Sequence, residues 1–143
     1  MRGSVEAPEI LKEIHIAGIA EYSELNQELR KVLQRSGTKF LDSPEEALSV
    51  ISVQGEGFNK RVLSVDAQGR AAEYELIYKF SFRVTSDTKE LVPLQKIEII
   101  RDYRFDPNNV LAKDAEEAQI RKEMIKFSVR QMMRRIETHL KHS

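Results

Sequence analysis

A clean alternation of apolar and polar residues in the middle of the chain restricts the fold more than any other feature. In AAEYELIYKFSFRVTSD (71–87), one set of alternate positions is apolar or aromatic and the other is mostly charged or hydroxylated, with Ile77 the exception. Successive side chains of a strand point to opposite faces, so this pattern predicts a half-buried antiparallel strand. The apolar set comprises Ala72, Tyr74, Leu76, Tyr78, Phe80, Phe82 and Val84.

Two further extended segments flank this strand and predict a meander. The segment before it runs from Val50 to Asp66, and its two glycines, Gly55 and Gly57, indicate a bulge or a twisted strand. The segment after it runs from about Leu91 to Phe105. The connections DAQGR (66–70) and SDTKE (86–90) are rich in turn residues, so each predicts a tight turn between neighbouring strands.

The two ends of the chain add one short strand and two helices. EIHIAGIA (13–20) predicts a strand, and Tyr22 to Ser36 predicts a helix with Ser23 as its N-cap and Gly37 as its C-cap. After DPNN (106–109), a second helix is expected from Val110 to Leu140. The predicted fold class is α/β of the α+β kind: a single domain, 1–143, with two helices packed on one face of a mostly antiparallel four-stranded sheet in the order β-α-β-β-β-α.

The last helix has two apolar edges at helical spacing. A narrow second edge contains Ile120, Met124 and Phe127. It either contacts the first helix or lies partly exposed and faces a protein partner. The broad edge is expected to cover the sheet, and it comprises Leu111, Ala115, Ala118, Ile125, Val129, Met132, Met133, Ile136 and Leu140. Lys122 lies inside this edge, so the start of the helix is expected to be frayed, bent or less buried than its far end.

Composition excludes several function classes. Lysine plus arginine number 23, as do aspartate plus glutamate, and this balance disfavours a nucleic-acid binder. The chain has no cysteine, which excludes disulfides, thiolate metal sites and a cysteine nucleophile. No apolar run approaches the ~18 residues that span a membrane. His139 and His142 are three apart near the C-terminus, a weak zinc signal without an adjacent acid cluster, so no metal or cofactor is expected.

The carboxylates do not form a convincing catalytic set. Glu116, Glu117 and Glu123 are interpreted as parts of solvated helix faces, and Glu117 pairs with Arg121 at i, i+4. Glu73 and Glu75 share a strand face beside Lys79, where cross-strand pairing is the simpler interpretation. A non-enzymatic role is therefore predicted, and a hydrolase that uses Glu73 or Glu75 is the distant alternative.

Basic side chains on the extended segments point to an anionic ligand. Lys60 and Arg61 precede the first hairpin turn, Arg70 follows it, and Lys113 opens the last helix. Ammonium and guanidinium groups pair strongly with phosphates. Alternating aromatic and basic positions on one sheet suit a ligand that carries both acyl chains and phosphates. Further bases on the later strands are Arg83, Lys96, Arg101 and Arg104.

Three stretches in the same order resemble the LPS-assembly lipoprotein LptE family, also called rare lipoprotein B. They are RGSVEAPE at the start, GRAAEYELIYKFSFRV in the middle and LAKDAEEAQIRKEMIKFSVRQMMRRI near the end. The resemblance implies an outer-membrane protein of Gram-negative bacteria on the periplasmic side. Family members are anchored by lipids on an N-terminal cysteine a few residues before an Arg-Gly like Arg2-Gly3. That cysteine is absent, so a form with signal and anchor removed is expected.

The resemblance also implies a function and a site. Family members plug the lumen of the outer-membrane barrel LptD, assist its assembly, and bind lipopolysaccharide (LPS) for insertion into the outer leaflet. Lys113 stands in the matching LAK and is the first expected phosphate contact, with Arg70, Arg61 and Lys60 as further LPS-binding residues. The family can carry a basic residue just before the glycine of the first hairpin turn. Here Gln68 precedes Gly69, so Arg70, beyond that glycine, is the substitute candidate.

One alternative keeps the location and changes the role. The chain is then a periplasmic protein-interaction module or chaperone without a direct role toward LPS. This hypothesis requires that the edge formed by Ile120, Met124 and Phe127 be exposed, because that edge would bind the partner.

Overall fold

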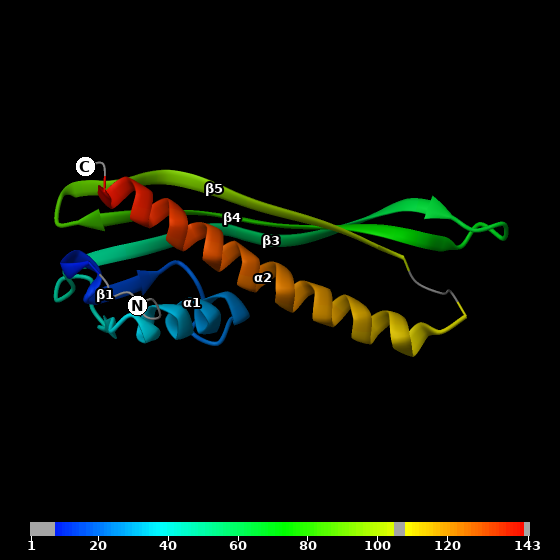
Figure 1. Cartoon of the computed structure of the whole chain (residues 1–143), viewed down its shortest axis with the longest axis horizontal. Helices are drawn as coiled ribbons and strands as arrows, with labels where there is room; N and C mark the ends of the chain where they lie inside the picture. The colour runs from blue at the N-terminus through cyan, green and yellow to red at the C-terminus, as the bar shows by residue number, and fades with distance from the viewer. Residues whose placement is uncertain (1–7, 105–107, 142–143) are drawn as a thin grey trace, which may run out of the picture.

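The computed structural model describes residues 8–104 and 108–141, which form one sheet with two α-helices on one of its faces (Figure 1). Both predicted helices and the three predicted long strands are present. In chain order the elements are η1 (Glu9–Leu11), β1 (Glu13–Ala17), α1 (Glu24–Arg35), β2 (Lys39–Phe40), β3 (Ser49–Val65), β4 (Ala71–Ser86), β5 (Lys89–Arg104) and α2 (Val110–Lys141).

The sheet is five-stranded and mixed, in the order β2-β1-β3-β4-β5. The predicted α+β class is confirmed, but the expected count of four strands is wrong. The additional strand, β2, has two residues, Lys39 and Phe40, and pairs in parallel with β1. β1 also pairs in parallel with β3, with Ile14 opposite Ser49. The antiparallel part of the sheet is the meander of β3, β4 and β5.

The predicted bulge in β3 is confirmed. Pairing with β4 loses register between Gln54 and Gly57. Glu56, inside the bulge, accepts a hydrogen bond from the hydroxyl of Tyr78 on β4 at 2.8 Å. Tyr78 has no exposed area, so this bond satisfies a polar group that burial removes from water.

The alternation along β4 orients the sheet as predicted. From Leu76 to Val84, the side chains of β4 that face the helices are fully or almost fully buried, whereas Lys79 and Arg83 on the other face are exposed. The first predicted turn holds because Asp66 Oδ1 accepts from the backbone N–H groups of Gln68 and Arg70, both at 2.9 Å. The buried set on β4 comprises Leu76, Tyr78, Phe80, Phe82 and Val84.

The caps predicted for α1 are also present. The Ser23 hydroxyl accepts from the backbone N–H of Asn26 at 3.1 Å, which satisfies one donor at the helix start. Gly37 has a φ of 91° and donates to the Gln34 carbonyl at 3.0 Å, as expected of a residue that ends a helix in the left-handed region. Three leucines of α1 enter the core: Leu25, Leu29 and Leu33.

The broad apolar edge predicted for α2 is buried in its second half, and the start of the helix is less buried than its far end, one of the outcomes that Lys122 indicated. Leu111 is 84% exposed, and Ala115 and Ala118 are exposed as well. Residues 111–123 include no buried residue. Within the described ranges, no helix has the length and apolar character needed to cross a membrane. The buried side of α2 comprises Met124, Ile125, Ser128, Val129, Met132 and Ile136.

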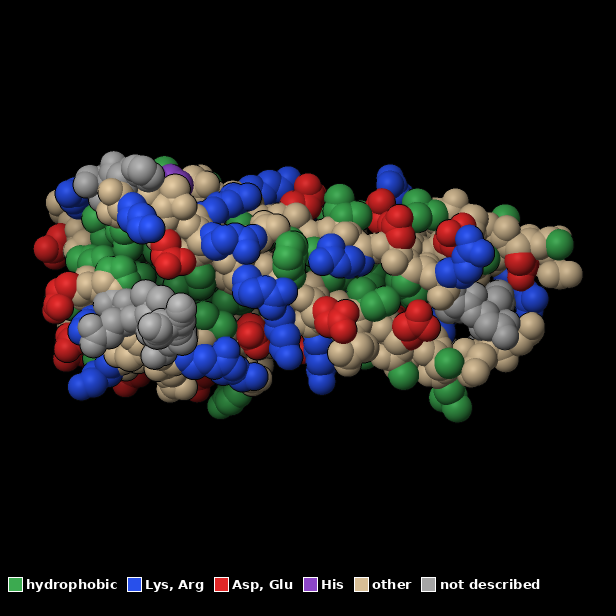
Figure 2. Space-filling model, in the orientation of Figure 1, with side chains coloured by type: hydrophobic (Ala, Val, Ile, Leu, Met, Phe, Trp, Pro, Cys, Tyr) green, Lys and Arg blue, Asp and Glu red, His purple; other side chains and the backbone are tan. Residues whose placement is uncertain are grey.

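The core is therefore concentrated at one end of the molecule. The second half of α2 packs on the same end of the sheet as α1 and β1, while its first half runs beside the outer ends of the long strands (Figure 1). Basic and acidic side chains are mixed over the helix side of the molecule, with basic ones gathered across its middle (Figure 2).

Candidate anion-binding site

Two of the four predicted phosphate-binding cations meet at one aromatic ring. Lys60 on β3 places its Nζ 4.8 Å from the centre of the Tyr74 ring on β4. Lys113, in the first turn of α2, places its Nζ 4.9 Å from the same ring centre and 3.5 Å from the Tyr74 hydroxyl. Both are cation–π distances. The pairing of β3 with β4, Lys60 opposite Leu76, turns Lys60 and Tyr74 to the helix side of the sheet.

Glu117 of α2 links these cations to the rest of the sheet. Its Oε1 accepts from Lys60 Nζ at 3.1 Å and from the Tyr103 hydroxyl of β5 at 2.5 Å. Its Oε2 accepts from Arg121 Nε, one turn further along α2, at 3.2 Å. One carboxylate therefore joins α2, β3 and β5. We call Lys60, Tyr74, Tyr103, Lys113, Glu117 and Arg121 the distal cluster.

The electrostatics of the cluster keep Glu117 ionised. Its side chain is 15% exposed, and burial alone would raise the pKa of a carboxyl group. The hydrogen bonds from Tyr103 and Lys60, with the charges of Lys60 and Arg121, outweigh burial and lower the pKa of Glu117 below its ordinary value. Burial and the bond to Glu117 raise the pKa of Tyr103, so its hydroxyl stays a donor.

Aromatic rings form the sheet side of the cluster. Tyr74 and Tyr103, opposite each other on β4 and β5, stack with ring centres 5.6 Å apart. Phe58 stacks on Tyr78 at 4.4 Å. The guanidinium of Arg121 lies 4.4 Å from the centre of the Phe58 ring. Cations and rings thus share one face here, whereas the sequence indicated aromatic and basic residues on opposite faces.

The other two predicted cations lie elsewhere. Arg61 points to the opposite face of the sheet, where it pairs with Glu75 at 2.6 Å. Arg70 lies at the hairpin turn, with its Nε 3.0 Å from Asp66 Oδ2. Its Nη1 donates to the side chain of Asn108, just before α2, at 3.3 Å. Arg70 therefore lies near the start of the helix that carries Lys113, whereas Arg61 does not belong to this side of the molecule.

The predicted partner-binding edge of α2 does not form an exposed surface. Met124 has no exposed area. Ile120 and Phe127 are partly buried and pack against the core. The guanidinium groups of Arg101 and Arg130 lie 5.1 and 5.4 Å from the centre of the Phe127 ring. The exposure that the interaction-module alternative requires is therefore absent at Met124.

The acidic pair that a hydrolase would need has ordinary ion-pair partners. Glu73 accepts from Ser64 at 2.6 Å and pairs with Arg104 at 3.2 Å. These contacts lower the pKa of Glu73, the opposite of what a general acid at neutral pH requires. Glu75 pairs with Arg61, so the cross-strand interpretation of both acids is confirmed.

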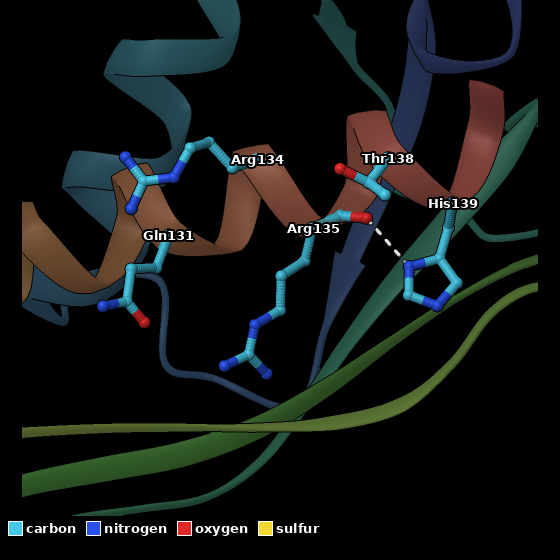
Figure 3. Close-up of a pocket in the computed structure, with 5 residues that line it drawn as sticks. All are labelled: Gln131, Arg134, Arg135, Thr138 and His139. Atoms are coloured by element: carbon cyan, nitrogen blue, oxygen red, sulfur yellow. Dashed lines mark hydrogen bonds between the residues drawn. The ribbon is translucent and has the colours of Figure 1, made fainter. Parts of the chain in front are cut away.

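A hollow of about 410 Å³ lies beside the C-terminal half of α2 (Figure 3). Arg135 donates to the Lys96 carbonyl of β5 at 2.7 Å, and His139 donates through Nδ1 to the Arg135 carbonyl at 2.9 Å. The described residues that line this hollow include no carboxylate or thiol beside His139. Residues 8–104 and 108–141 contain no cluster of metal-ligating side chains; His142, of the zinc hypothesis, lies outside them.

Sequence reasoning identified Lys60 and Lys113 but missed the residues between them. Glu117 was interpreted as solvated, and that is wrong, because its side chain faces the sheet. Its i, i+4 pair with Arg121 is confirmed. The available signal was the spacing of Lys113, Glu117 and Arg121, which places three charged residues on one side of the helix.

Comparisons with known proteins agree over most of the chain. A family model described as LptE: Lipopolysaccharide-assembly matches residues 11–136. The LPS-assembly lipoprotein LptE of Yersinia enterocolitica is 26% identical over 137 residues, which cover 95% of this chain and 66% of that protein. The protein of the same name from Photorhabdus laumondii is 28% identical over 138 residues, covering 96% and 75%.

Solved structures share both sequence and fold. Rare lipoprotein B from Shewanella oneidensis is 33% identical with a TM-score of 0.75, covering 91% of this chain and 99% of that one. Lipoprotein B from Nitrosomonas europaea is 30% identical with a TM-score of 0.77, covering 94% and 86%. With the family match over residues 11–136, these likenesses confirm the predicted resemblance: the chain belongs to the LptE lipopolysaccharide-assembly family.

Proposed function

We propose that this protein is a non-enzymatic component of LPS assembly that binds LPS through the distal cluster. The observation that carries the proposal is the meeting of Lys60 and Lys113 at the Tyr74 ring. Ammonium groups attract the phosphates of the lipid, and aromatic rings supply apolar area for its acyl chains. Arg70, at the hairpin turn near the start of α2, is a further candidate contact.

Charge reversal tests the site. Lys60→Glu and Lys113→Glu are each expected to weaken LPS binding by roughly tenfold or more, since each replaces an attractive charge with a repulsive one. Lys39→Glu, at an exposed position on β2, is the matched control and is expected to bind as wild type does. Binding is measured by titration with purified LPS. If Lys60→Glu and Lys113→Glu bind LPS as tightly as Lys39→Glu does, the distal cluster is rejected as the site.

We further propose that the protein occupies the lumen of the LptD barrel, supports assembly of that barrel, and is held at the periplasmic side of the outer membrane by an N-terminal lipid anchor. The face of the sheet away from the helices supports this role. It carries cross-strand ion pairs, Arg61 with Glu75 and Arg104 with Glu73, and the interior of a membrane barrel is polar.

Co-purification with the LptD barrel domain tests the plug role. The lipidated full-length protein and the present chain are compared side by side. A stable one-to-one complex of both forms is the expected result, because the proposed contacts lie on the folded domain. Failure of both forms to associate would reject the barrel role. The alternative hypothesis is a protein-interaction module or chaperone without a direct role toward LPS. It predicts that the protein binds the barrel and that neither form binds LPS.

A further inference from the structure

A carboxylate of the protein itself occupies the position between two cations of the distal cluster. Glu117 accepts from Lys60 at 3.1 Å and from Arg121 at 3.2 Å. Its side chain is only 15% exposed, whereas the preceding residue, Glu116, is exposed to solvent. Lys60 is one of the cations that the proposed function assigns to phosphate binding, and the shared carboxylate brings Arg121 beside it.

A phosphate competes with a carboxylate for the same donors. Both are anions that accept charge-assisted hydrogen bonds, and a phosphate offers more acceptor oxygens and up to two negative charges. With Glu117 seated, a phosphate that approaches Lys60 also meets a like charge. Binding of a phosphate at this site therefore requires that it replace the Glu117 carboxylate. The stronger the contacts of Glu117 with Lys60 and Arg121, the weaker the net affinity for the phosphate.

We propose that Glu117 is an internal counter-ion that phosphate groups of LPS displace from Lys60 and Arg121 when they bind. This inference rests on the proposed function, because it assigns the LPS phosphates to the distal cluster. Glu117 then determines specificity: a ligand with a single weak anionic group does not displace it, whereas a ligand with clustered phosphates does.

The displacement also changes how α2 is held. From Leu111 to Glu123 no residue is buried, and the first buried residue is Met124. In this half of the helix, Glu117 connects α2 to both β3 and β5. Segments with little buried apolar area open at low free-energy cost. Loss of the Glu117 contacts without a bound ligand is therefore expected to loosen the first three turns of α2 while the half after Met124 stays packed. Phosphates that contact Lys60 on β3 and Arg121 on α2 take over this link when LPS is bound.

Two variants with the same charge change separate this competition from a general charge effect. Glu117→Gln removes the internal counter-ion, and Glu116→Gln removes an equal charge from the neighbouring, exposed position. Titration with purified LPS is expected to give about tenfold tighter binding by Glu117→Gln than by Glu116→Gln, a difference of about 1.4 kcal/mol. Dephosphorylated LPS is expected to bind both variants equally, and inorganic pyrophosphate tests whether a free phosphate suffices.

A third variant covers the case in which Glu117→Gln disturbs the fold. Tyr103→Phe keeps every charge and removes only the hydroxyl that donates to Glu117. Because Glu117 is then held less firmly, LPS binding is expected to tighten severalfold. Hydrogen exchange without LPS is expected to be faster in residues 112–121 of Glu117→Gln than of wild type, with residues 124–136 unchanged.

The outcomes distinguish the two proposals. Tighter binding by Glu117→Gln and by Tyr103→Phe supports displacement. Equal gains for Glu117→Gln and Glu116→Gln, or weaker binding by Glu117→Gln, would overturn it and leave LPS binding itself intact. If neither wild type nor any variant binds LPS, the proposed function fails and this inference fails with it.

Discussion

Two glycines with the same backbone conformation are expected to respond differently to substitution. Gly18, after β1, and Gly37, after α1, both have a φ of 91°. A Cβ at Gly18 would lie 2.0 Å from the Val53 carbonyl oxygen, whereas Gly37 has open space around it. Gly37→Ala is expected to cost roughly 1–2 kcal/mol of unfolding free energy. Gly18→Ala is expected to cost roughly twice that or more, because the backbone of β3 must also move.

Urea unfolding of the two variants measures this difference. Because both glycines have the same φ, the left-handed backbone costs the two variants the same free energy. Any additional loss of unfolding free energy in Gly18→Ala therefore reports the close approach of this glycine to β3. Equal losses for Gly18→Ala and Gly37→Ala would contradict the close contact at Val53.

At the same scale, residue type alone identified part of the site. Lys60 and Lys113 were predicted because cations near a hairpin and at a helix start suggest an anionic ligand. Glu117 could not be recognised in this way. An acid with a base four residues later has the same sequence pattern on a solvated helix face as on a face against a sheet. The difference here comes from Tyr103 and Lys60, which belong to other elements.

At the scale of the element, the second half of α2 explains why apolar residues of its first half are exposed. The second half is fixed to the sheet by buried residues such as Val129, Met132 and Ile136. Because the helix is continuous, the packing of its second half also fixes which side of the first half faces the sheet. Leu111 and Ala115 consequently point to solvent although they are apolar, and Lys113 and Glu117 face the rings of the sheet.

The ionisation of Glu117 gives this half of α2 a pH dependence. The pKa of Glu117 is lowered in the folded protein from an ordinary 4.5. Its ionic contacts therefore stabilise the fold fully above about pH 4.5, and this contribution is lost as the pH falls through the lowered value. Glu117→Gln is expected to be less stable than wild type by about 1–2 kcal/mol at pH 7.

Unfolding free energies of wild type and Glu117→Gln between pH 7 and pH 3 check the sign. The difference between the two proteins is expected to shrink as the pH falls below the ordinary pKa of a glutamate. Glu116→Gln serves as the control and is expected to match wild type throughout. A difference that stays constant down to pH 3 would mean that the charge of Glu117 is not what stabilises the contact.

At the scale of the whole molecule, the alternating strand and the turn residues were enough to predict the meander. They were not enough to predict the parallel edge of the sheet. β2 has only Lys39 and Phe40, too short for any periodicity, and its pairing depends on where α1 returns the chain. Backbone bonds make this edge, including one from Lys39 N–H to the Lys12 carbonyl at 2.7 Å. A two-residue strand leaves no sequence pattern of its own.

The uneven distribution of the core predicts that salt acts on one end of the molecule only. The half of α2 after Met124 is held by buried apolar side chains, and its first half is held in large part by ionic contacts such as Lys60 with Glu117 at 3.1 Å. Screening strengthens between 0.1 M and 1 M salt, as the Debye length falls from about 10 Å to about 3 Å. Apolar packing does not weaken under these conditions.

Hydrogen exchange at 0.1 M and 1 M sodium chloride tests this prediction along α2. Amides of residues 112–121 are expected to exchange severalfold faster at the higher salt concentration, because the segment opens more often. Amides of residues 124–136 are expected to keep their rates. Glu117→Gln is expected to exchange rapidly in the first segment at both concentrations, since it has already lost the salt-sensitive contact. A salt effect of equal size in both segments would mean that the helix opens as one unit, and that the distal cluster does not hold its first half separately.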